Sequence, residues 1–464
     1  MTDLYGQFLA KALFPAFEAA RGRPTVPLLH YLEETERWSG PELRDLQTGF
    51  LRRLLRHAYR HTAYYRRMLD ERGLRVADFT SVADLQKLPL LDRPTLRATM
   101  LERTANAPPA AVIRKVTSGS SGQPVEVLYN SESRHWRDAI RLRGYGWGGY
   151  RMGLRTFHYW GFVPPPDQTF WKRSKTNLDR WIKRDLYLDC TPRSEQALTD
   201  AVDKIRRFRP QAMIAYASGA GALARFINDR GLRDWDDIPV LTGAEGLLPH
   251  DRLEIERAFG DAFDTYGCRE VMLMASECPA HQGFHTSMEN LIVEVVVREG
   301  STVRPARPGE TGEVVITDLH NLACPMIRYV NGDLAVAAAD ERCRCGRGLS
   351  RIAQIQGRVT ETMYDGRGRA VGGLVFNILF STIGHVARSF QVHQREDGHV
   401  VFKVVPYHGA ALPTREEQLL RGHAERYLPG APFSIEIVDN IPLSPAGKRR
   451  VVVCEYKGAR SASL

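Results

Sequence analysis

A loop rich in hydroxyl groups and glycine is the segment of this chain best suited to bind an anion. Glycine lets successive backbone N–H groups converge on one point without a side-chain clash, and serine and threonine hydroxyls add hydrogen-bond donors. An ordinary solvated turn has a similar composition and is the alternative. The loop lacks the Gly-Lys-Ser/Thr ending of a Walker loop. We interpret it as a phosphate-binding turn made of Thr117, Ser118, Gly119, Ser120, Ser121 and Gly122.

Two short apolar segments flank this loop and predict the strands that would hold it. The run 110–113 precedes the loop, and 125–129 follows it with alternating apolar and polar residues. Farther along, helical and strand patterns alternate, which is typical of an α/β sheet. The predicted helices are 197–208 and 221–228, and the predicted strands are 212–216 and 238–241.

The pattern changes after Gly357-Arg358, where a second, smaller α+β unit is predicted. A domain boundary near residue 357 would divide the chain into a large N-terminal domain, 1–356, and a small C-terminal domain, 357–464. The elements predicted in the second unit are a hairpin of 390–394 and 400–404, a helix at 415–427, and strands at 434–438 and 451–453.

The bulk properties indicate a globular protein of more than one domain. A chain of 464 residues is long for a single core. No apolar run is long enough to cross a bilayer, and the first residues do not resemble a secretory signal, so we expect no membrane span and a cytoplasmic location. Seven cysteines, an odd number, argue against a disulfide framework.

The formal net charge of +10 suits an anionic ligand, nucleic acid or an acidic membrane surface, although scattered charges for solubility are an alternative. The densest basic segment, 51–60, lies in a predicted helix that Ser39 and Glu42 would cap. Nucleic-acid recognition motifs are absent, so we expect no nucleic-acid partner. The apolar residues of this helix recur at helical spacing and predict its core face: Leu43, Leu46, Phe50, Leu54 and Ala58.

A competing motif suggests a different class of enzyme. Residues 219–224, GAGALA, fit the G-x-G-x-x-A pattern of dinucleotide-binding proteins and follow a predicted strand. The acidic residue expected about twenty positions later is not clear. An NAD-type oxidoreductase is therefore a weaker alternative.

Four further segments contain residue types that bind nucleotides or supply charge. Taken singly, each is more often a packing or surface feature. They are 266–270 (YGCRE), 327–334 (IRYVNGDL), 356–358 (QGR) and 443–448 (LSPAGK). Their order after the hydroxyl-rich loop resembles the adenylate-forming superfamily, specifically its phenylacetate-CoA ligase branch with the CapK and coenzyme F390 synthetase-like proteins.

The resemblance implies a large N-terminal adenylate-forming domain of mixed sheets and helices, with a small mobile α+β C-terminal domain. It also implies that the loop 117–122 holds the β- and γ-phosphates of ATP. Asp333 would accept both ribose hydroxyls, a role that suits a carboxylate. The other nucleotide-site residues would be Ala244 and Glu245 bordering the adenine, Tyr266 stacking on it, Gly267, Cys268 and Arg269 beside it, and Arg358 near the ribose and phosphates.

The implied reaction joins a carboxylic acid to AMP and then to a second acceptor. Lys448 would bridge the carboxylate and the α-phosphate, and Mg²⁺ on Glu270 would add positive charge where two anions meet. Rotation of the small domain would then withdraw Lys448 for the second step. Coenzyme A is the expected acceptor. The alternatives are an amine or hydroxyl, or transfer of AMP to a phenolic acceptor.

Aromatic residues fall where relatives line their acyl pocket, which favours an aryl or arylacetic acid, although core packing is the alternative. A homodimer is expected only by analogy. The candidate pocket residues are Tyr159, Trp160, Tyr216, Ala217 and Ser218.

Three cysteines and one histidine form a ligand set suited to a structural zinc ion. Six residues separate Cys278 from His285, and Cys343 and Cys345 follow later in the chain. Three thiolates and an imidazole match a closed tetrahedral zinc site, and similar Cys/His pairs occur in this branch. His281 is the alternative fourth ligand, and free thiols are the alternative to a metal site.

Overall fold

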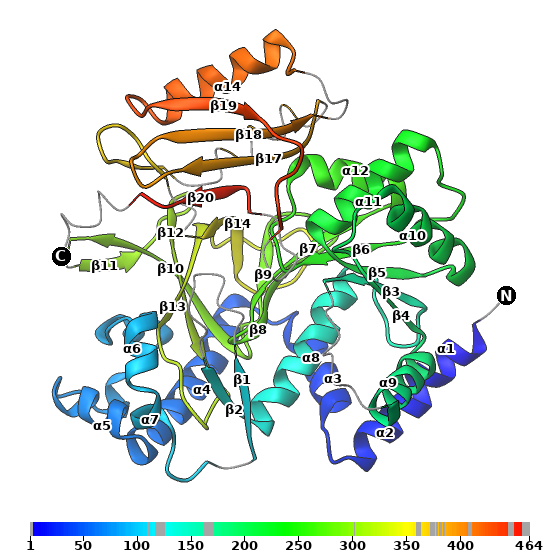
Figure 1. The fold of residues 1–464 in the computed structure, drawn as a ribbon. Helices are drawn as coiled ribbons and strands as arrows, with labels where there is room; N and C mark the ends of the chain where they lie inside the picture. The colour runs from blue at the N-terminus through cyan, green and yellow to red at the C-terminus, as the bar shows by residue number, and fades with distance from the viewer. Residues whose placement is uncertain are drawn as a thin grey trace.

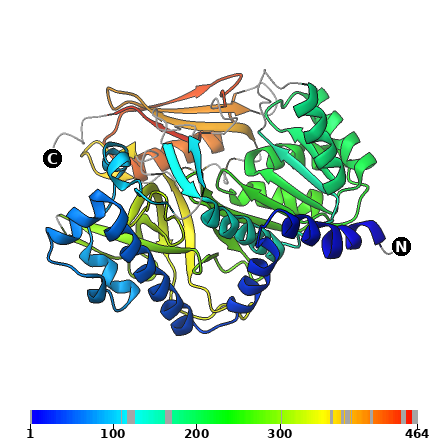
Figure 2. The same ribbon diagram turned by 90° about the horizontal axis from the view of Figure 1, so that it is seen from below.

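The computed structural model describes residues 3–108, 111–116, 126–161, 170–300, 302–358, 363–371, 376, 379, 383, 386–406, 411–443 and 450–456. A large twisted sheet runs through the molecule, with helices around it, and a smaller sheet with a helix against it lies at one end of it (Figures 1 and 2). The large sheet has the strand order β11-β10-β12-β13-β14-β9-β8-β7-β6-β5-β3-β4. This architecture confirms the predicted α/β class.

One half of the large sheet is parallel and is covered by helices. Its strands are β3 (Thr156–Trp160), β4 (Asp185–Asp189), β5 (Ala212–Tyr216), β6 (Val240–Gly243) and β7 (Ala262–Cys268). Its helices are α9 (Phe170–Lys183), α10 (Glu195–Phe208), α11 (Ala217–Arg230) and α12 (Pro249–Phe259). This half contains the elements predicted from the sequence, the helices at 197–208 and 221–228 and the strands at 212–216 and 238–241. However, α11 begins at Ala217 instead of residue 221 because it follows β5 without an intervening loop.

The other half of the sheet is antiparallel and carries two of the candidate nucleotide residues, Asp333 and Arg358. In the pairing of β13 with β14, Asp333 lies opposite Arg358. The strands of this half are β8 (Met272–Glu277), β9 (Phe284–Thr286), β10 (Leu291–Glu299), β11 (Thr302–Pro305), β12 (Thr311–Asp318), β13 (Tyr329–Ala337) and β14 (Arg351–Arg358).

The chain begins with helices that pack against the large sheet. The predicted cap is confirmed at α4, where the Ser39 backbone N–H donates to Glu42 Oε2 at 2.7 Å. The buried face of α4 is wider than predicted, since Leu51 and Leu55 are also buried. These helices are α1 (Leu4–Phe8), a π-helical turn (Leu9–Leu13), α2 (Phe14–Ala20), α3 (Thr25–Thr35), α4 (Gly40–His61), α5 (Ala63–Asp70), α6 (Arg93–Ala98) and α7 (Met100–Arg103), with 3₁₀ turns at Val76–Asp78 and Val82–Lys87.

A separate two-stranded hairpin, β1 (Val112–Val116) and β2 (Glu126–Asn130), confirms the predicted strands. The loop 117–122 between them lies outside the described residues. Buried residues of β2 share a core with Tyr266 and Tyr329, so the hairpin strands pack beside the candidate nucleotide residues. Helix α8 (Ser131–Trp147) follows the hairpin and is fixed by a buried Arg143–Glu289 ion pair at 2.6 Å.

The C-terminal unit has its own sheet and core. Its sheet order is β19-β18-β17-β20, and α14 (Thr414–Tyr427) accompanies it. The predicted hairpin, helix and strands are confirmed to within about three residues at each end. Leu248 of the large unit packs into this core, which joins the two units. The strands are β15 (Met363–Tyr364), β16 (Ala370–Val371), β17 (Ala387–Gln394), β18 (Val400–Pro406), β19 (Phe433–Ile437) and β20 (Val452–Cys454).

The domain boundary near residue 357 stays a prediction. Among the described helices, none is both long and apolar enough to cross a bilayer. All seven cysteines lie within the described residues, and none of them forms a disulfide.

Candidate active site

A buried hydrogen-bond network joins the predicted aromatic and ribose-binding residues. Tyr266 lies near the end of β7, and its hydroxyl donates to Asp333 Oδ2 on β13 at 2.7 Å. Asn331 Nδ2 donates to both of them, at 2.9 Å to the Tyr266 hydroxyl and 2.7 Å to Asp333 Oδ2. Burial and the Asp333 carboxylate raise the pKa of Tyr266, so its hydroxyl keeps the proton that it donates. The network holds the Asp333 carboxylate in one orientation.

Glu270 lies in the same region, where a sharp turn between β7 and β8 positions it. A Cβ at Gly267 would lie 2.4 Å from the Met272 carbonyl oxygen, so this turn requires glycine. The Tyr329 hydroxyl donates to Glu270 Oε1 at 3.2 Å, and Arg93 Nη2 lies 3.7 Å from the same oxygen. A buried carboxylate is an oxygen ligand of the kind that Mg²⁺ prefers.

Alternation along β13 explains why these groups converge. Tyr329, Asn331 and Asp333 are spaced by two residues, so their side chains share one face of the strand. Arg93 reaches this face from α6 and also donates to the Asn331 carbonyl oxygen at 3.0 Å. Sequence reasoning missed Arg93 because no nearby residue pattern marks it. Asn331 lay inside the motif 327–334 and could have been found there.

The neighbouring turn segment holds Cys268 and Arg269. Arg269 is exposed, and Cys268 is half-buried. Burial, followed by the nearby Glu270 carboxylate, raises the pKa of the Cys268 thiol. Cys268 is therefore a neutral thiol at neutral pH, which suits packing beside a ligand and not nucleophilic attack.

The predicted adenine edge follows β6. Ala244 has a φ of 68°, a left-handed conformation that turns the chain sharply after Gly243. The Ser218 backbone N–H donates to Glu245 Oε2 at 3.2 Å, so the turn contacts the start of α11. Ser218 belongs to the candidate acyl pocket. The two predicted regions are therefore in direct contact.

A buried acid that sequence reasoning missed supports this edge. Asp264 accepts hydrogen bonds from the Thr242 hydroxyl at 2.8 Å and the Leu247 backbone N–H at 3.2 Å. Burial, followed by the Glu277 carboxylate, raises the pKa of Asp264 to about 7. Its environment alone produces this shift, so the sequence carried no signal for it.

The candidate acyl-pocket residues lie together at β3, β5 and the start of α11. The rings of Trp160 and Tyr216 meet edge to face, with centroids 4.5 Å apart. Arg193 Nη2 donates to the Ser218 hydroxyl at 2.9 Å, a cation that the sequence did not single out. Tyr159 and Ala217 are fully buried, so they pack in the core. Ser218 is also fully buried and Tyr216 nearly so, which leaves the half-buried Trp160 as the stronger candidate for substrate contact.

The glycines of the dinucleotide-like motif have a packing role. Gly219 and Gly221 lie inside α11, not in the turn before it. A Cβ at Gly221 would lie 2.3 Å from Asp251 Oδ1, and one at Gly219 would lie 2.9 Å from Cys190 Cβ. Both glycines let neighbouring segments approach the helix. The geometry therefore favours close packing over dinucleotide binding.

The predicted metal ligands come together in one cluster. The ligand atoms of Cys278, His285, Cys343 and Cys345 all lie within 4.8 Å of one another. Cys278 Sγ lies 3.8 Å from Cys343 Sγ. A tetrahedral zinc ion with Zn–S bonds of about 2.3 Å places two sulfurs about 3.8 Å apart, so this spacing fits zinc.

The histidine of the cluster is held in the form that binds metal. His285 Nδ1 lies 3.2 Å from the Leu349 carbonyl oxygen, which leaves Nε2 facing Cys345 Sγ at 3.3 Å. Burial lowers the pKa of His285 to about 4, so its imidazole is neutral. His281, the alternative ligand, lies outside the cluster, and its Nδ1 is 3.5 Å from Glu277 Oε2.

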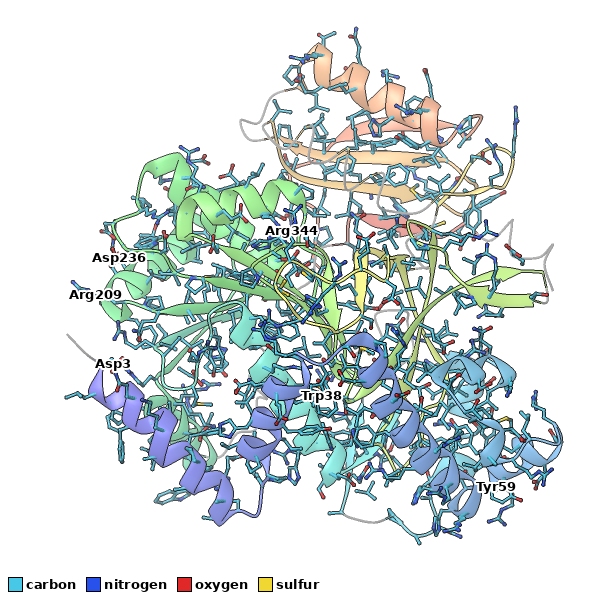
Figure 3. The ribbon with its side chains drawn as sticks, turned by 180° about the vertical axis from the view of Figure 1, so that it is seen from behind. Asp3, Trp38, Tyr59, Arg209, Asp236 and Arg344 are labelled. Carbon is cyan, nitrogen blue, oxygen red and sulfur yellow. The ribbon has the colours of Figure 1, made fainter. Side chains whose placement is uncertain are left out.

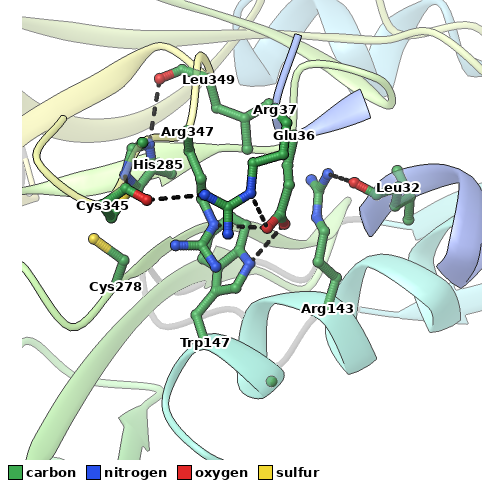
Figure 4. Close-up of polar contacts among 12 residues, drawn as sticks. Leu32, Glu36, Arg37, Arg143, Trp147, Cys278, His285, Cys345, Arg347 and Leu349 are labelled. Carbon is green, nitrogen blue, oxygen red and sulfur yellow. Dashed lines mark hydrogen bonds and ion pairs between the residues drawn. The ribbon is translucent and has the colours of Figure 1, made fainter. Parts of the chain in front are cut away.

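Hydrogen bonds around these four candidate ligands connect them to the turn between α3 and α4 (Figure 4). Arg347 Nε donates to Glu36 Oε1 at 3.0 Å, and Trp147 Nε1 donates to Glu36 Oε2 at 2.8 Å. Arg37 Nη1 donates to the Cys345 carbonyl oxygen at 3.0 Å. Figure 3 labels one residue in each of the two connected segments: Trp38 in the turn between α3 and α4, and Arg344 between Cys343 and Cys345.

Two predicted groups lie outside the described residues: the loop 117–122 and Lys448. Arg358 is placed only by its backbone, opposite Asp333. The structure thus brings together Tyr266, Glu270 and Asp333 in one region and Glu245 with Ser218 in another.

Comparisons with known proteins bear on what this arrangement is. No family model matches the chain. The chain is 27% identical to phenylacetate-coenzyme A ligase of Thermus thermophilus over 376 residues, covering 79% of this chain and 82% of that protein. It is 21% identical to CapK of Staphylococcus aureus over 439 residues, covering 92% of this chain and 93% of that protein.

The fold has a counterpart among solved structures. The crystal structure of 2-hydroxyisobutyryl-CoA ligase in the postadenylation state matches with a TM-score of 0.72 and 17% sequence identity, over 93% of each chain. These likenesses confirm the adenylate-forming ligase fold and the predicted resemblance to the phenylacetate-CoA ligase and CapK branch.

Proposed function

We infer that this chain, which has the adenylate-forming ligase fold and resembles the phenylacetate-CoA ligases and CapK, is an ATP-dependent, carboxylate-activating ligase. It forms an acyl-AMP and pyrophosphate and then transfers the acyl group to coenzyme A. The observation that carries this proposal is the network of Tyr266, Asn331 and Asp333 beside Glu270. An oriented carboxylate next to an aromatic residue and a second buried acid suits a nucleoside triphosphate with its Mg²⁺.

The residues would divide the first step between binding and charge stabilisation. A carboxylate oxygen of the acid attacks the α-phosphorus of ATP, and the bond to the β-phosphate oxygen breaks to release pyrophosphate. Asp333 would hold the ribose, and the loop 117–122 would hold the β- and γ-phosphates. Lys448 would supply positive charge between the two reacting anions. Mg²⁺ held by Glu270 would add Lewis-acid stabilisation.

The second step needs a nucleophile that displaces AMP from the acyl carbon. The thiol of coenzyme A is the acceptor we propose, with an amine or hydroxyl as the alternative. An aryl or arylacetic acid is the favoured substrate class, because Trp160 and Tyr216 present aromatic surface next to the Ser218–Glu245 contact. A cytoplasmic location stays a prediction from the sequence, and a homodimer stays a prediction of the resemblance.

ATP–pyrophosphate exchange across a panel of aryl, arylacetic and aliphatic acids tests this function. We expect exchange that requires Mg²⁺ and one class of acid, with aromatic acids preferred because of the aromatic pocket. Adding coenzyme A, or amines, to an active acid then distinguishes thioester from amide formation. Absence of exchange over the whole panel, together with a change in nicotinamide absorbance, would instead support the oxidoreductase alternative.

We also propose that Cys278, His285, Cys343 and Cys345 bind a structural zinc ion. The supporting observations are the 3.8 Å spacing of two sulfurs and the neutral, oriented imidazole. The ion would join the segment after Glu270 to the loop before β14, and Glu36 would connect that loop to the N-terminal helices. The candidate nucleotide region would thereby be stiffened from one side.

The paired substitution Cys343→Ser, Cys345→Ser should remove zinc and lower the melting temperature. Two of four ligands are lost, and metal binding contributes directly to folding stability. Elemental analysis of purified protein measures the zinc, and thermal denaturation measures the stability. Cys454→Ser is the matched control, because that cysteine lies in the C-terminal sheet. Equal zinc content in the paired variant and the wild type would refute the site.

A further inference from the structure

Helix α9 exposes large apolar side chains that the proposed reaction does not use. Trp171, Leu178 and Trp181 have 81%, 57% and 75% of their surfaces exposed. Spacings of seven and three residues place the three on one side of the helix. Single exposed apolar residues are ordinary, but two tryptophans and a leucine on one helix face form a patch that indicates binding.

The N-terminal helices extend this patch. The Tyr5 hydroxyl donates to the Ile182 carbonyl oxygen at 3.0 Å, and Arg184 Nη1 lies 2.6 Å from Asp3 Oδ2, so α1 is fastened to the end of α9. Helices α1, α2 and α9 lie together at one edge of the molecule (Figure 1). They form what we call the α1–α9 surface, whose exposed apolar residues include Leu4, Phe8, Phe17, Trp171, Leu178 and Trp181.

Positive charge accompanies the apolar side chains. Between 170 and 184 the only acidic residue is Asp179, and both Arg173 and Lys175 are exposed. Lys183 pairs with Asp179 at 2.8 Å, which leaves the segment with a clear excess of cations. Arg184 is paired with Asp3, and Arg180 lies over the ring of Tyr187, so Arg173 and Lys175 are the exposed cations that carry this charge.

We propose that the α1–α9 surface docks onto an anionic phospholipid membrane, with α9 lying in the plane of the interface. Tryptophan and leucine would enter the boundary between headgroups and acyl chains, where indole rings are favoured. The lysine and arginine side chains would meet the anionic headgroups. A ligase held there would act on an acid or acceptor concentrated at the membrane.

A second copy of the chain fits this surface less well. In a symmetric dimer built on this surface, the cationic segment 170–184 of one subunit would lie close to the same segment of the other subunit. Like charges repel across such an interface. Interfaces between protein subunits are also depleted in lysine. An anionic lipid surface removes this conflict because it supplies the opposite charge.

Co-sedimentation of the full chain with vesicles tests the proposal. Vesicles of phosphatidylcholine alone are compared with equimolar phosphatidylcholine and phosphatidylglycerol. We expect binding to the anionic vesicles that weakens as salt is added, because salt screens the headgroup charge. The triple variant Trp171→Ser, Leu178→Ser, Trp181→Ser should bind at least about tenfold more weakly, because burial of even one such side chain accounts for a factor of this size.

The matched control is Leu101→Ser, Leu253→Ser, which removes two apolar side chains that are 88% and 68% exposed on other elements. It should bind like the wild type. Arg173→Glu, Lys175→Glu should lose the preference for anionic vesicles. Absence of wild-type binding, or binding that the triple variant retains, overturns the proposal. So does light scattering that finds a dimer which only the triple variant breaks. ATP–pyrophosphate exchange should be unchanged in all variants, so this test is independent of the proposed function.

Discussion

Asp333→Ala is expected to lower kcat/KM for ATP by about 100-fold or more in ATP–pyrophosphate exchange, with little change in the KM for the acid. Each hydrogen bond from a ribose hydroxyl to a carboxylate contributes about 1.5–3 kcal/mol, and the proposal assigns two such bonds to Asp333. The site is preorganised, because Tyr266 and Asn331 already orient the carboxylate at 2.7 Å. Steady-state kinetics at saturating acid measures the change.

A comparison with 2′-deoxyATP separates ribose binding from a merely structural role. The wild type should prefer ATP to the deoxynucleotide, and Asp333→Ala should lose this preference because the carboxylate that accepts the 2′-hydroxyl no longer exists. Tyr266→Phe is the control: it removes a hydrogen bond to Asp333 but keeps the carboxylate, so it should retain the preference. A variant that melts at lower temperature yet still discriminates the two nucleotides would contradict the assignment.

Lys448→Ala is expected to reduce ATP–pyrophosphate exchange by about 100- to 1000-fold, the range found when one charge-stabilising group is removed from an active site. The first step brings two anions together, and neutralising them is the proposed role of this lysine. The second step has no such requirement. Thioester formation from a synthetic acyl-adenylate and coenzyme A should therefore stay within a few-fold of the wild type.

Arg449→Ala is the matched control, because it removes the adjacent positive charge in the sequence. Its exchange rate should remain close to that of the wild type. Equal losses in both variants would mean that the segment contributes general positive charge, not a specific bridge. Loss of both half-reactions in Lys448→Ala would place the lysine in the second step as well.

Local pattern predicted a large part of the fold. Strand β5 and the end of α10 lie where the apolar periodicity placed them, and Ser39 with Glu42 caps α4 as expected. The hairpin and helix of the C-terminal unit were also predicted. Each of these signals lies within a few consecutive residues, where periodicity and capping chemistry act directly.

Candidate site residues were predicted through their order along the chain, and the zinc ligands through their residue types. Four ligand residues do meet in one cluster, with His285 and not His281 as the imidazole. The same order also allowed the motif at 219–224 to suggest a dinucleotide site. Only the burial of Gly221 against Asp251 showed a packing role, because a glycine pattern does not reveal what approaches the backbone.

The sequence by itself determined the sheet and helix elements, the superfamily resemblance and the set of candidate residues. The tertiary structure decided which of them meet: Tyr266 and Asp333 are 67 residues apart and lie on β7 and β13, which are not neighbours in the sheet, so only the folded chain brings them together. It also brought Arg93 to Glu270 and raised the pKa of Asp264 to about 7. Contacts and pKa shifts depend on atoms from distant segments, so no local pattern could contain them.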